Sequence, residues 1–179
     1  GTLTQTGIAT FAAVPVFSAG INVPAGTLNG TEITTTATNN LGVGIDAVDS
    51  ITTGDYNVGF GDNALTAATE GDNNNAFGYQ ALYTNTTGND NAAFGYYALY
   101  SNTTAGNNDA FGRAALYNNT TGAANNAFGN YALLTNTTGA ENSAFGYSAL
   151  RLNTTADDNA AFGYEALTAN TTGASNSAF

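Results

Sequence analysis

Residues 74–90 read NNAFGYQALYTNTTGND, and the chain repeats this phrase at a spacing of 17 residues. The asparagine that opens the phrase recurs in every copy, at Asn40, Asn57, Asn74, Asn91, Asn108, Asn125, Asn142, Asn159 and Asn176. A spacing kept over so many positions indicates a tandem array of one structural unit. The sequence therefore predicts a repeat domain over residues 40–179, with about eight coils, and we expect the array to continue beyond the chain end.

Other positions of the phrase keep the same register. Glycine recurs at Gly44, Gly61, Gly78, Gly95, Gly112, Gly129, Gly146 and Gly163. Phenylalanine precedes it at Phe60, Phe77, Phe94, Phe111, Phe128, Phe145 and Phe162, and threonine recurs at Thr52, Thr69, Thr86, Thr103, Thr120, Thr137, Thr154 and Thr171. An alanine and a bulky apolar residue follow each glycine, as at Ala81 and Leu82.

A unit of 17 residues is too short for the helix pairs of the common helical repeats. Its Gly, Asn and Thr also disfavour helix. Short strands separated by turns fit better, so we predict an all-β fold, a parallel β-solenoid in which equivalent residues stack at about 4.8 Å. The expected ladders are those of Asn74, Asn91, Asn108, Asn125, Asn142 and Asn159, of Gly78 and Gly95, of Phe77, Phe94 and Phe111, and of Thr86 and Thr103. We expect the Phe and Leu columns to fill the interior.

The first 39 residues lack the repeat and contain both prolines, Pro15 and Pro24. Alternation of Thr with apolar residues in this segment is typical of short strands. We interpret residues 1–39 as a β-rich stem, a cap over the first coil, or a docking segment for a neighbouring subunit. A solenoid needs a cap or a partner at its end because an open sheet edge invites uncontrolled pairing.

Composition narrows the function. The net charge of −11, from 13 acids and 2 bases, argues against nucleic acid or an anionic membrane as a partner. No apolar stretch approaches the roughly 18 residues that membrane insertion requires. The chain has no His or Cys for a nucleophilic or zinc site, and no acid pair is marked out for glycoside hydrolysis. We therefore expect neither enzyme activity nor a cofactor.

Residues 76–112, AFGYQALYTNTTGNDNAAFGYYALYSNTTAGNNDAFG, resemble the NTAxGYxALxxNTTGxxN repeats of phage tail-fibre and related virion-fibre proteins. More distantly, Asn74, Ala76 and Gly78 match the head repeats of trimeric autotransporter adhesins. The resemblance covers residues 40–179. It implies an elongated trimeric β-roll or β-helix used for attachment, with three chains along a common axis. Residues 40–179 contain none of these families' chaperone or anchor domains, so virion and cell-surface origins both stay open.

The NTT triplets match the N-glycosylation sequon, at Asn85, Asn102, Asn119, Asn136, Asn153 and Asn170. Turn chemistry explains the same Asn-Thr-Thr-Gly pattern, and we favour that interpretation.

Acids gather between NTTG and the repeated asparagine. Glu141 and Asp158 are one period apart, so their charges should stack at coil spacing. Calcium is a possible ligand, but the glycine-aspartate pattern of calcium-binding β-rolls is absent. A solvated acidic edge is the default, and we predict no metal site.

Tyrosine occupies several variable columns, at Tyr79 and Tyr96 and at Tyr83, Tyr100 and Tyr117. Aromatic faces with a hydroxyl suit contact with a cell-surface glycan. Tyrosine is also enriched between protomers, and we favour that interface role.

These observations lead to a structural and adhesive role as a segment of an extracellular fibre. We expect a phage tail fibre involved in host attachment, assembled as a homotrimer. A bacterial or archaeal surface adhesin, or an extracellular filament subunit that polymerises end to end, is the alternative. An ice- or solute-binding solenoid that uses the threonine ladder fits less well, because no regular second threonine column lies two residues before the first.

Overall fold

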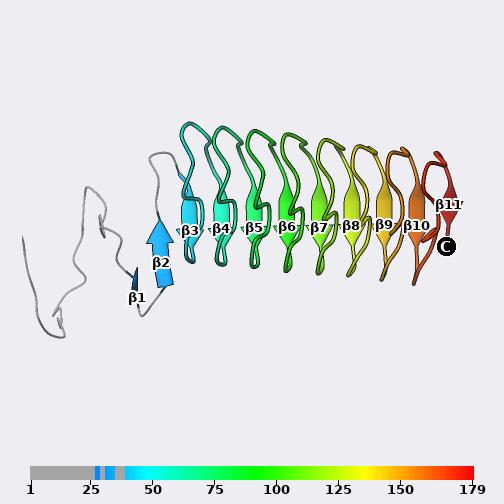
Figure 1. The fold of residues 1–179 in the computed structure, drawn as a ribbon, viewed down its shortest axis with the longest axis horizontal. Helices are drawn as coiled ribbons and strands as arrows, with labels where there is room; N and C mark the ends of the chain where they lie inside the picture. The colour runs from blue at the N-terminus through cyan, green and yellow to red at the C-terminus, as the bar shows by residue number, and fades with distance from the viewer. Residues whose placement is uncertain (1–26, 29–30, 35–38) are drawn as a thin grey trace, which may run out of the picture.

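A computed structural model describes residues 27–28, 31–34 and 39–179, and residues 39–179 form a parallel β-solenoid (Figure 1). Each coil contributes one short strand, and the strands lie side by side in sequence order in a single sheet. The described part of the chain contains no helix. The predicted fold class is confirmed.

The strands are β1 (Thr27–Leu28), β2 (Thr31–Thr34), β3 (Leu41–Val43), β4 (Val58–Phe60), β5 (Asn75–Phe77), β6 (Ala92–Phe94), β7 (Asp109–Phe111), β8 (Asn126–Phe128), β9 (Ser143–Phe145), β10 (Ala160–Phe162) and β11 (Ser177–Ala178). Pairing is parallel from β3 to β11. It is antiparallel between β1 and β2 and between β2 and β3.

Successive parallel strands pair at an offset of one repeat. Ala76 lies opposite Ala93, and Phe77 lies opposite Phe94. The turns keep the same offset, since the Thr120 amide donates to the Thr137 carbonyl at 2.9 Å. The predicted 17-residue coil is therefore confirmed, with equivalent residues of neighbouring coils next to each other.

The interior holds three apolar columns. They are the middle residue of each strand and the Ala-Leu pair that follows each glycine. Within the central coils all of these side chains are 0% exposed: Ala76, Ala93, Ala110, Ala127 and Ala144, then Ala81, Ala98, Ala115 and Ala132, and Leu82, Leu99, Leu116 and Leu133. Burial of one leucine is worth on the order of 1.5–3 kcal/mol, so the leucine column is the main apolar contribution of each coil.

The expectation that phenylalanine fills the interior is wrong. Neighbouring strand residues point to opposite faces of the sheet, and the alanine before each phenylalanine points inward. The phenylalanines therefore point outward, and Phe60 is 52% and Phe162 39% exposed. They form an external ladder in which the rings of Phe77 and Phe94 are parallel, with centroids 4.7 Å apart. Sequence alone could not decide this, because alanine and phenylalanine are both apolar.

The glycine column marks a bend that no other residue fits. Its backbone φ is between 130° and 148°, a region that L side chains rarely adopt. A Cβ added at Gly112 would also lie 2.6 Å from the carbonyl carbon and oxygen of Gly129. The bend thus needs glycine both for its dihedral angle and for the close approach of adjacent coils.

The buried leucines also have a left-handed backbone, with φ between 50° and 55° from Leu65 to Leu167. This conformation costs a non-glycine residue on the order of 1–3 kcal/mol, and it is least accessible to β-branched residues. That preference explains why Leu, rather than Ile or Val, occupies the column from the second coil on. Val48 in the first coil is the exception, at φ 58°.

The described part of residues 1–39 lies against the first coil. Strand β2 pairs with β3, with Ile33 opposite Val43 and Thr34 opposite Gly42. The β3 edge is therefore covered by a strand from outside the repeat array, as the cap interpretation expects. Residues 1–26, 29–30 and 35–38, on which the stem and docking interpretations also rest, lie outside the described residues.

The glycine column provides a test of close coil contact. We expect Gly112→Ala to lower the unfolding midpoint more than Gly163→Ala does. Both positions share nearly the same φ, 138° and 137°, but a Cβ at Gly163 would meet only the Ala166 Cβ, at 4.0 Å. Backbone strain alone should cost about 1–3 kcal/mol, and Gly112→Ala adds the clash. Thermal and urea unfolding measure the difference, and equal losses in the two variants would contradict the contact between glycine positions.

Candidate functional site

A ladder of buried asparagines runs through the solenoid, and we call Asn40, Asn57, Asn74, Asn91, Asn108, Asn125, Asn142, Asn159 and Asn176 the first asparagine ladder. The Oδ1 of Asn125 accepts hydrogen bonds from the backbone amide of Asn142 at 3.0 Å and from its Nδ2 at 3.1 Å. The Nδ2 of Asn125 donates to the Gly139 carbonyl at 2.8 Å. Each amide thus donates and accepts at once, which allows identical residues to stack in a buried position.

A second asparagine ladder consists of the NTT asparagines Asn85, Asn102, Asn119, Asn136, Asn153 and Asn170. The Nδ2 of Asn136 donates to Asn119 Oδ1 at 2.9 Å and to the Gly139 carbonyl at 2.8 Å. That carbonyl also accepts from Asn125, so the two ladders meet on one oxygen. The role of this ladder was missed in the sequence, although its 17-residue recurrence was the signal.

The glycosylation hypothesis is wrong for most of these asparagines. Five of them, Asn85, Asn102, Asn119, Asn136 and Asn153, are 0% exposed, and each side-chain amide donates hydrogen bonds inside the fold. An amide nitrogen that carries a glycan cannot occupy this position. Asn170 is partly buried and makes the same two kinds of bond. The turn interpretation accounts for the NTTG pattern.

The two threonines of each NTT triplet differ in role. The Thr86 hydroxyl donates to the Thr103 carbonyl of the next coil at 3.0 Å, and the Thr103 hydroxyl donates to Thr120 at 3.1 Å. The following residues are exposed and form a single outer column: Thr53, Thr87, Thr104, Thr121, Thr138 and Thr155, with Glu70 in one coil. Only one threonine column is therefore free to face solvent in each coil.

The acidic residues support the coil turns. Asp72 accepts a hydrogen bond from the Asp55 amide at 2.8 Å, and Asp157 accepts one from the Ala140 amide at 2.7 Å. Glu141 and Asp158 lie one coil apart in a column with left-handed backbone, both at φ 58°. Asn and Asp are enriched in that conformation, which explains part of the acidic pattern. Within residues that the structure describes, no three His, Cys, Asp or Glu side chains converge to hold a metal ion.

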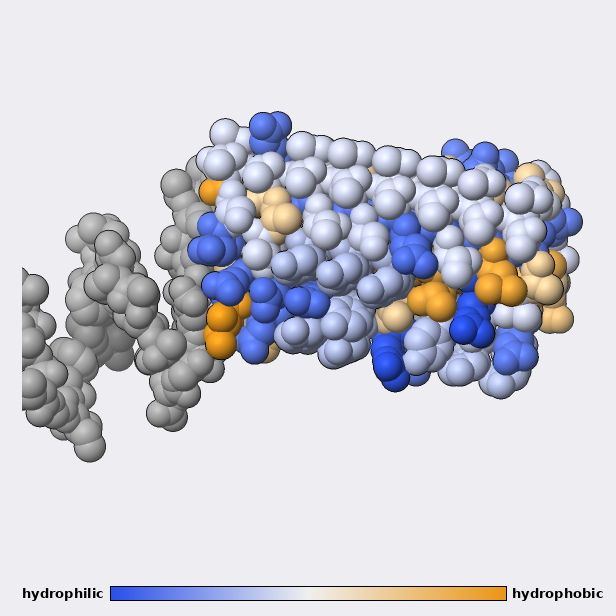
Figure 2. Space-filling model, viewed as in Figure 1, coloured by the Kyte–Doolittle hydropathy of each residue, from blue (hydrophilic) through white to orange (hydrophobic). Residues whose placement is uncertain are grey.

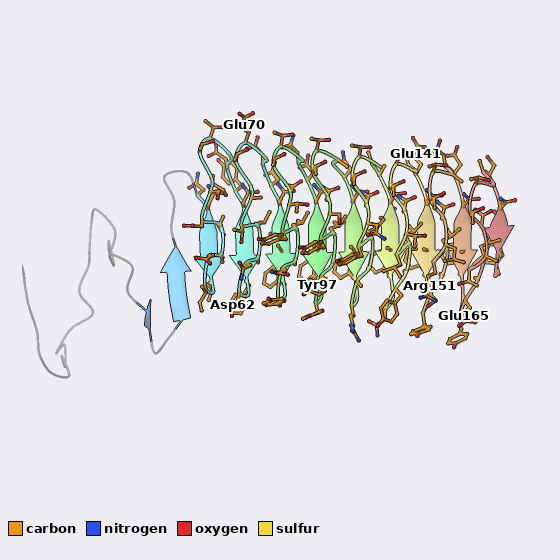
Figure 3. All side chains as sticks on the ribbon, in the orientation of Figure 1. Asp62, Glu70, Tyr97, Glu141, Arg151 and Glu165 are labelled. Carbon is orange, nitrogen blue, oxygen red and sulfur yellow. The ribbon has the colours of Figure 1, made fainter. Side chains whose placement is uncertain are left out.

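The tyrosine columns meet along one edge of the rod, on which Figure 3 labels Tyr97. The rings of Tyr83, Tyr100 and Tyr117 stack at 5.3 and 5.1 Å, and those of Tyr79 and Tyr96 stack at 5.4 Å. Tyr97 joins the two stacks, with ring centroids 4.1 Å from Tyr96 and 5.2 Å from Tyr100. We call these six residues the tyrosine cluster.

Stacking limits what the tyrosine cluster can bind. Within a column the interplanar angles are 6–17°, so neighbouring rings cover each other's faces. A sugar that packs on an aromatic ring needs an open face. The columns instead present ring edges and hydroxyl groups to a partner. Arg113 adds a cation beside the cluster, 5.9 Å from the Tyr96 ring centroid and 5.5 Å from that of Tyr131.

Electrostatics in the tyrosine cluster favour the neutral phenols. The hydrogen bond with Tyr96, together with desolvation and nearby phenols, raises the pKa of Tyr97 to about 12. Burial raises the pKa of Tyr100. Outside the cluster, the negative charge of Glu165 raises the pKa of Tyr164. The cluster therefore stays uncharged through neutral pH, as packing against an uncharged partner requires.

Most of the rod face shown in Figure 2 is weakly polar, with scattered hydrophilic and hydrophobic residues. None of the described segments is a helix long and apolar enough to cross a membrane. Comparison with protein-family models, curated proteins and solved structures gives no match to this chain.

The first asparagine ladder predicts a large difference between two adjacent residues. Asn125→Ala should destabilise the chain by at least about 3 kcal/mol, because it leaves the Asn142 amide and the Asn108 Oδ1 without partners. Asn126→Ala, on the outer face of β8, should change stability by less than about 0.5 kcal/mol. Urea unfolding of both variants provides the comparison. Similar stability of the two would show that the ladder contributes little.

The raised pKa of Tyr97 predicts an alkaline transition. Its folded pKa of about 12 exceeds the model value of 10.0, so its contribution to stability is complete below pH 10 and is lost as pH rises through about 12. Tyrosinate absorbance should show a late phase that Tyr97→Phe removes. Tyr131→Phe is the control and should leave that phase in place. Survival of the phase in Tyr97→Phe would mean that another tyrosine is responsible.

Proposed function

We propose that this chain is a structural and adhesive segment of an extracellular fibre, and specifically of a phage tail fibre that takes part in host attachment. The carrying observation is the in-register stack of identical coils, which makes a rod whose length grows with repeat number. Such a rod holds a binding surface away from the particle or cell that bears it. The resemblance of residues 76–112 to fibre repeats supports the virion assignment. The proposed role is non-enzymatic and needs no cofactor.

The proposed assembly is a homotrimer with the three rods parallel. A lone solenoid exposes an aromatic ladder and a tyrosine cluster along its length, and exposed aromatic rows usually mark association. The net charge of −11 keeps the assembly soluble and disfavours anionic partners. A cell-surface glycan is the proposed receptor, bound through tyrosine hydroxyl edges beside Arg113.

A surface adhesin or filament subunit is the second candidate, and the pairing of β2 with β3 is the observation that favours it. A strand from outside the array adds to the edge of a coil in antiparallel register. The same kind of addition between molecules would link subunits end to end. An ice- or solute-binding solenoid has less support, since one exposed threonine column makes a narrow face.

Mass in solution tests the assembly. Light scattering of the full chain should give about three times the chain mass of 18.1 kDa for the trimer. Mass that grows without limit as concentration rises would favour the end-to-end filament. A monomer at all concentrations would count against both fibre assignments.

Receptor binding is tested on a glycan array. The triple variant Tyr83→Ala, Tyr100→Ala, Tyr117→Ala should lose signal at least tenfold, because it removes the hydroxyl row of one stack. Thr87→Ala, Thr104→Ala, Thr121→Ala is the matched control on the exposed threonine column. Unchanged binding in the tyrosine variant would remove this cluster from the receptor site.

A further inference from the structure

The outer face of the sheet is defined by two columns of strand residues. The third residue of each strand and its equivalents form the phenyl ridge: Phe60, Phe77, Phe94, Phe111, Phe128, Phe145, Phe162 and Phe179. The first residue of each strand forms the flanking column: Val58, Asn75, Ala92, Asp109, Asn126, Ser143 and Ala160. Both columns point away from the interior, because the alanine between them is buried.

The phenyl ridge is continuous and rigid. Between Phe77 and Phe145 every neighbouring ring pair has centroids 4.7 Å apart and an interplanar angle of 4–7°. Each ring is held by the rings above and below it, so little side-chain freedom is left to lose when a partner covers the ridge. The flanking column is made of shorter side chains, so it forms a lower strip beside the ridge.

This face is almost free of charge in a strongly acidic chain. Of its residues only Asp109 is ionisable. Figure 3 shows Glu70 and Glu141 at one edge of the rod and Asp62, Arg151 and Glu165 at the opposite edge. Two molecules that each carry −11 repel through those edges, but they can approach through the sheet face. Charge depletion with aromatic enrichment is the composition of an interface core.

The spacing of the phenyl ridge selects a second copy as the occupant. A partner that fits along the whole ridge must repeat at the same interval of 4.7 Å. Another coil stack of this chain has that interval by construction. A cationic partner would be drawn to the acidic edges instead, and an anionic one would be repelled.

We propose that copies of this chain associate side by side and in the same direction through the outer sheet face, with the phenyl ridge of one copy against the flanking column of the next. The direction follows from symmetry. Rotation about an axis parallel to the rod carries the ridge to the opposite side of the facing sheet, so it meets the flanking column. A copy that runs in the opposite direction would place ridge against ridge, and the two flanking columns would be left apart.

This inference rests on the proposed fibre function and refines its assembly. Three copies around an axis parallel to the rods keep the ridge-to-column contact between each pair of neighbours. The interface therefore lies on the phenyl ridge, whereas the sequence suggested the tyrosine columns. The tyrosine cluster is left free to contact a receptor.

Two kinds of variant of the full chain test the contact. Phe111→Asp with Phe128→Asp places charge on the ridge, and Asn126→Trp fills the flanking column while the ridge stays intact. Each should weaken association on the order of 100-fold or more in sedimentation equilibrium. Thr121→Asp with Thr138→Asp makes the same charge change on the exposed threonine column and should leave association unchanged. Circular dichroism and the unfolding midpoint should match wild type, since all these side chains point outward.

The direction of the copies is measured separately. The chain has no cysteine, so Thr53→Cys, Thr104→Cys and Thr155→Cys each give one spin-label position along the rod. Parallel copies predict the same inter-copy distance from all three labels. Distances that are longer at the two outer positions than at Thr104→Cys would show opposite directions and overturn the proposal.

The outcomes separate this inference from the proposed function. If wild type associates but the Phe111, Phe128 and Asn126 variants associate equally well, the interface is elsewhere and only the inference fails. Loss of association in Tyr83→Ala, Tyr100→Ala, Tyr117→Ala, with none in the phenylalanine variant, would give the interface to the tyrosine cluster. A wild-type chain that stays monomeric overturns both.

Discussion

Each coil depends on the coil next to it, because almost every polar group in the interior finds its partner one repeat away. The asparagine amide makes this possible, since it carries two donors and an acceptor and can therefore bond to a copy of itself. The bond from Asn142 to Asn125 is reproduced at Asn159 to Asn142, and the backbone amides join the same chain of bonds. Apolar stacking of leucine fills the space beside these ladders, but it does not fix the register as directional hydrogen bonds do.

That dependence also explains how the chain accommodates a strained backbone. Every coil contains a glycine with φ near 140° and left-handed residues such as Leu116 and Tyr131. In an isolated 17-residue peptide these conformations would be unfavourable. In the stack they bring carbonyl and amide groups of successive coils within hydrogen-bond distance, as between Leu116 and Ala132 at 3.0 Å. Stability is then a sum of contacts between nearest neighbours, as expected for a repeat array.

The sequence was sufficient for the solenoid, because a register kept by Asn, Gly and Leu has few other structural explanations. It was insufficient wherever two apolar or two polar residues are adjacent in the phrase. Ala76 and Phe77 are both apolar, and only the strand direction determines that the ring points outward. Likewise Asn85 reads as a glycosylation sequon or a turn, and burial of its amide decides between them. The left-handed position of Glu141 was hidden because acids there also suggested a charged edge.

The central claim is that equivalent residues of successive repeats are neighbours along one axis. The most direct measurement is spin-spin broadening between labels at Thr121→Cys and Thr138→Cys in one chain, diluted with unlabelled protein. The two backbones should be about 4.8 Å apart, so strong dipolar broadening is predicted. A doubly labelled chain whose spectrum equals the sum of the two single-label spectra would contradict the stacked solenoid.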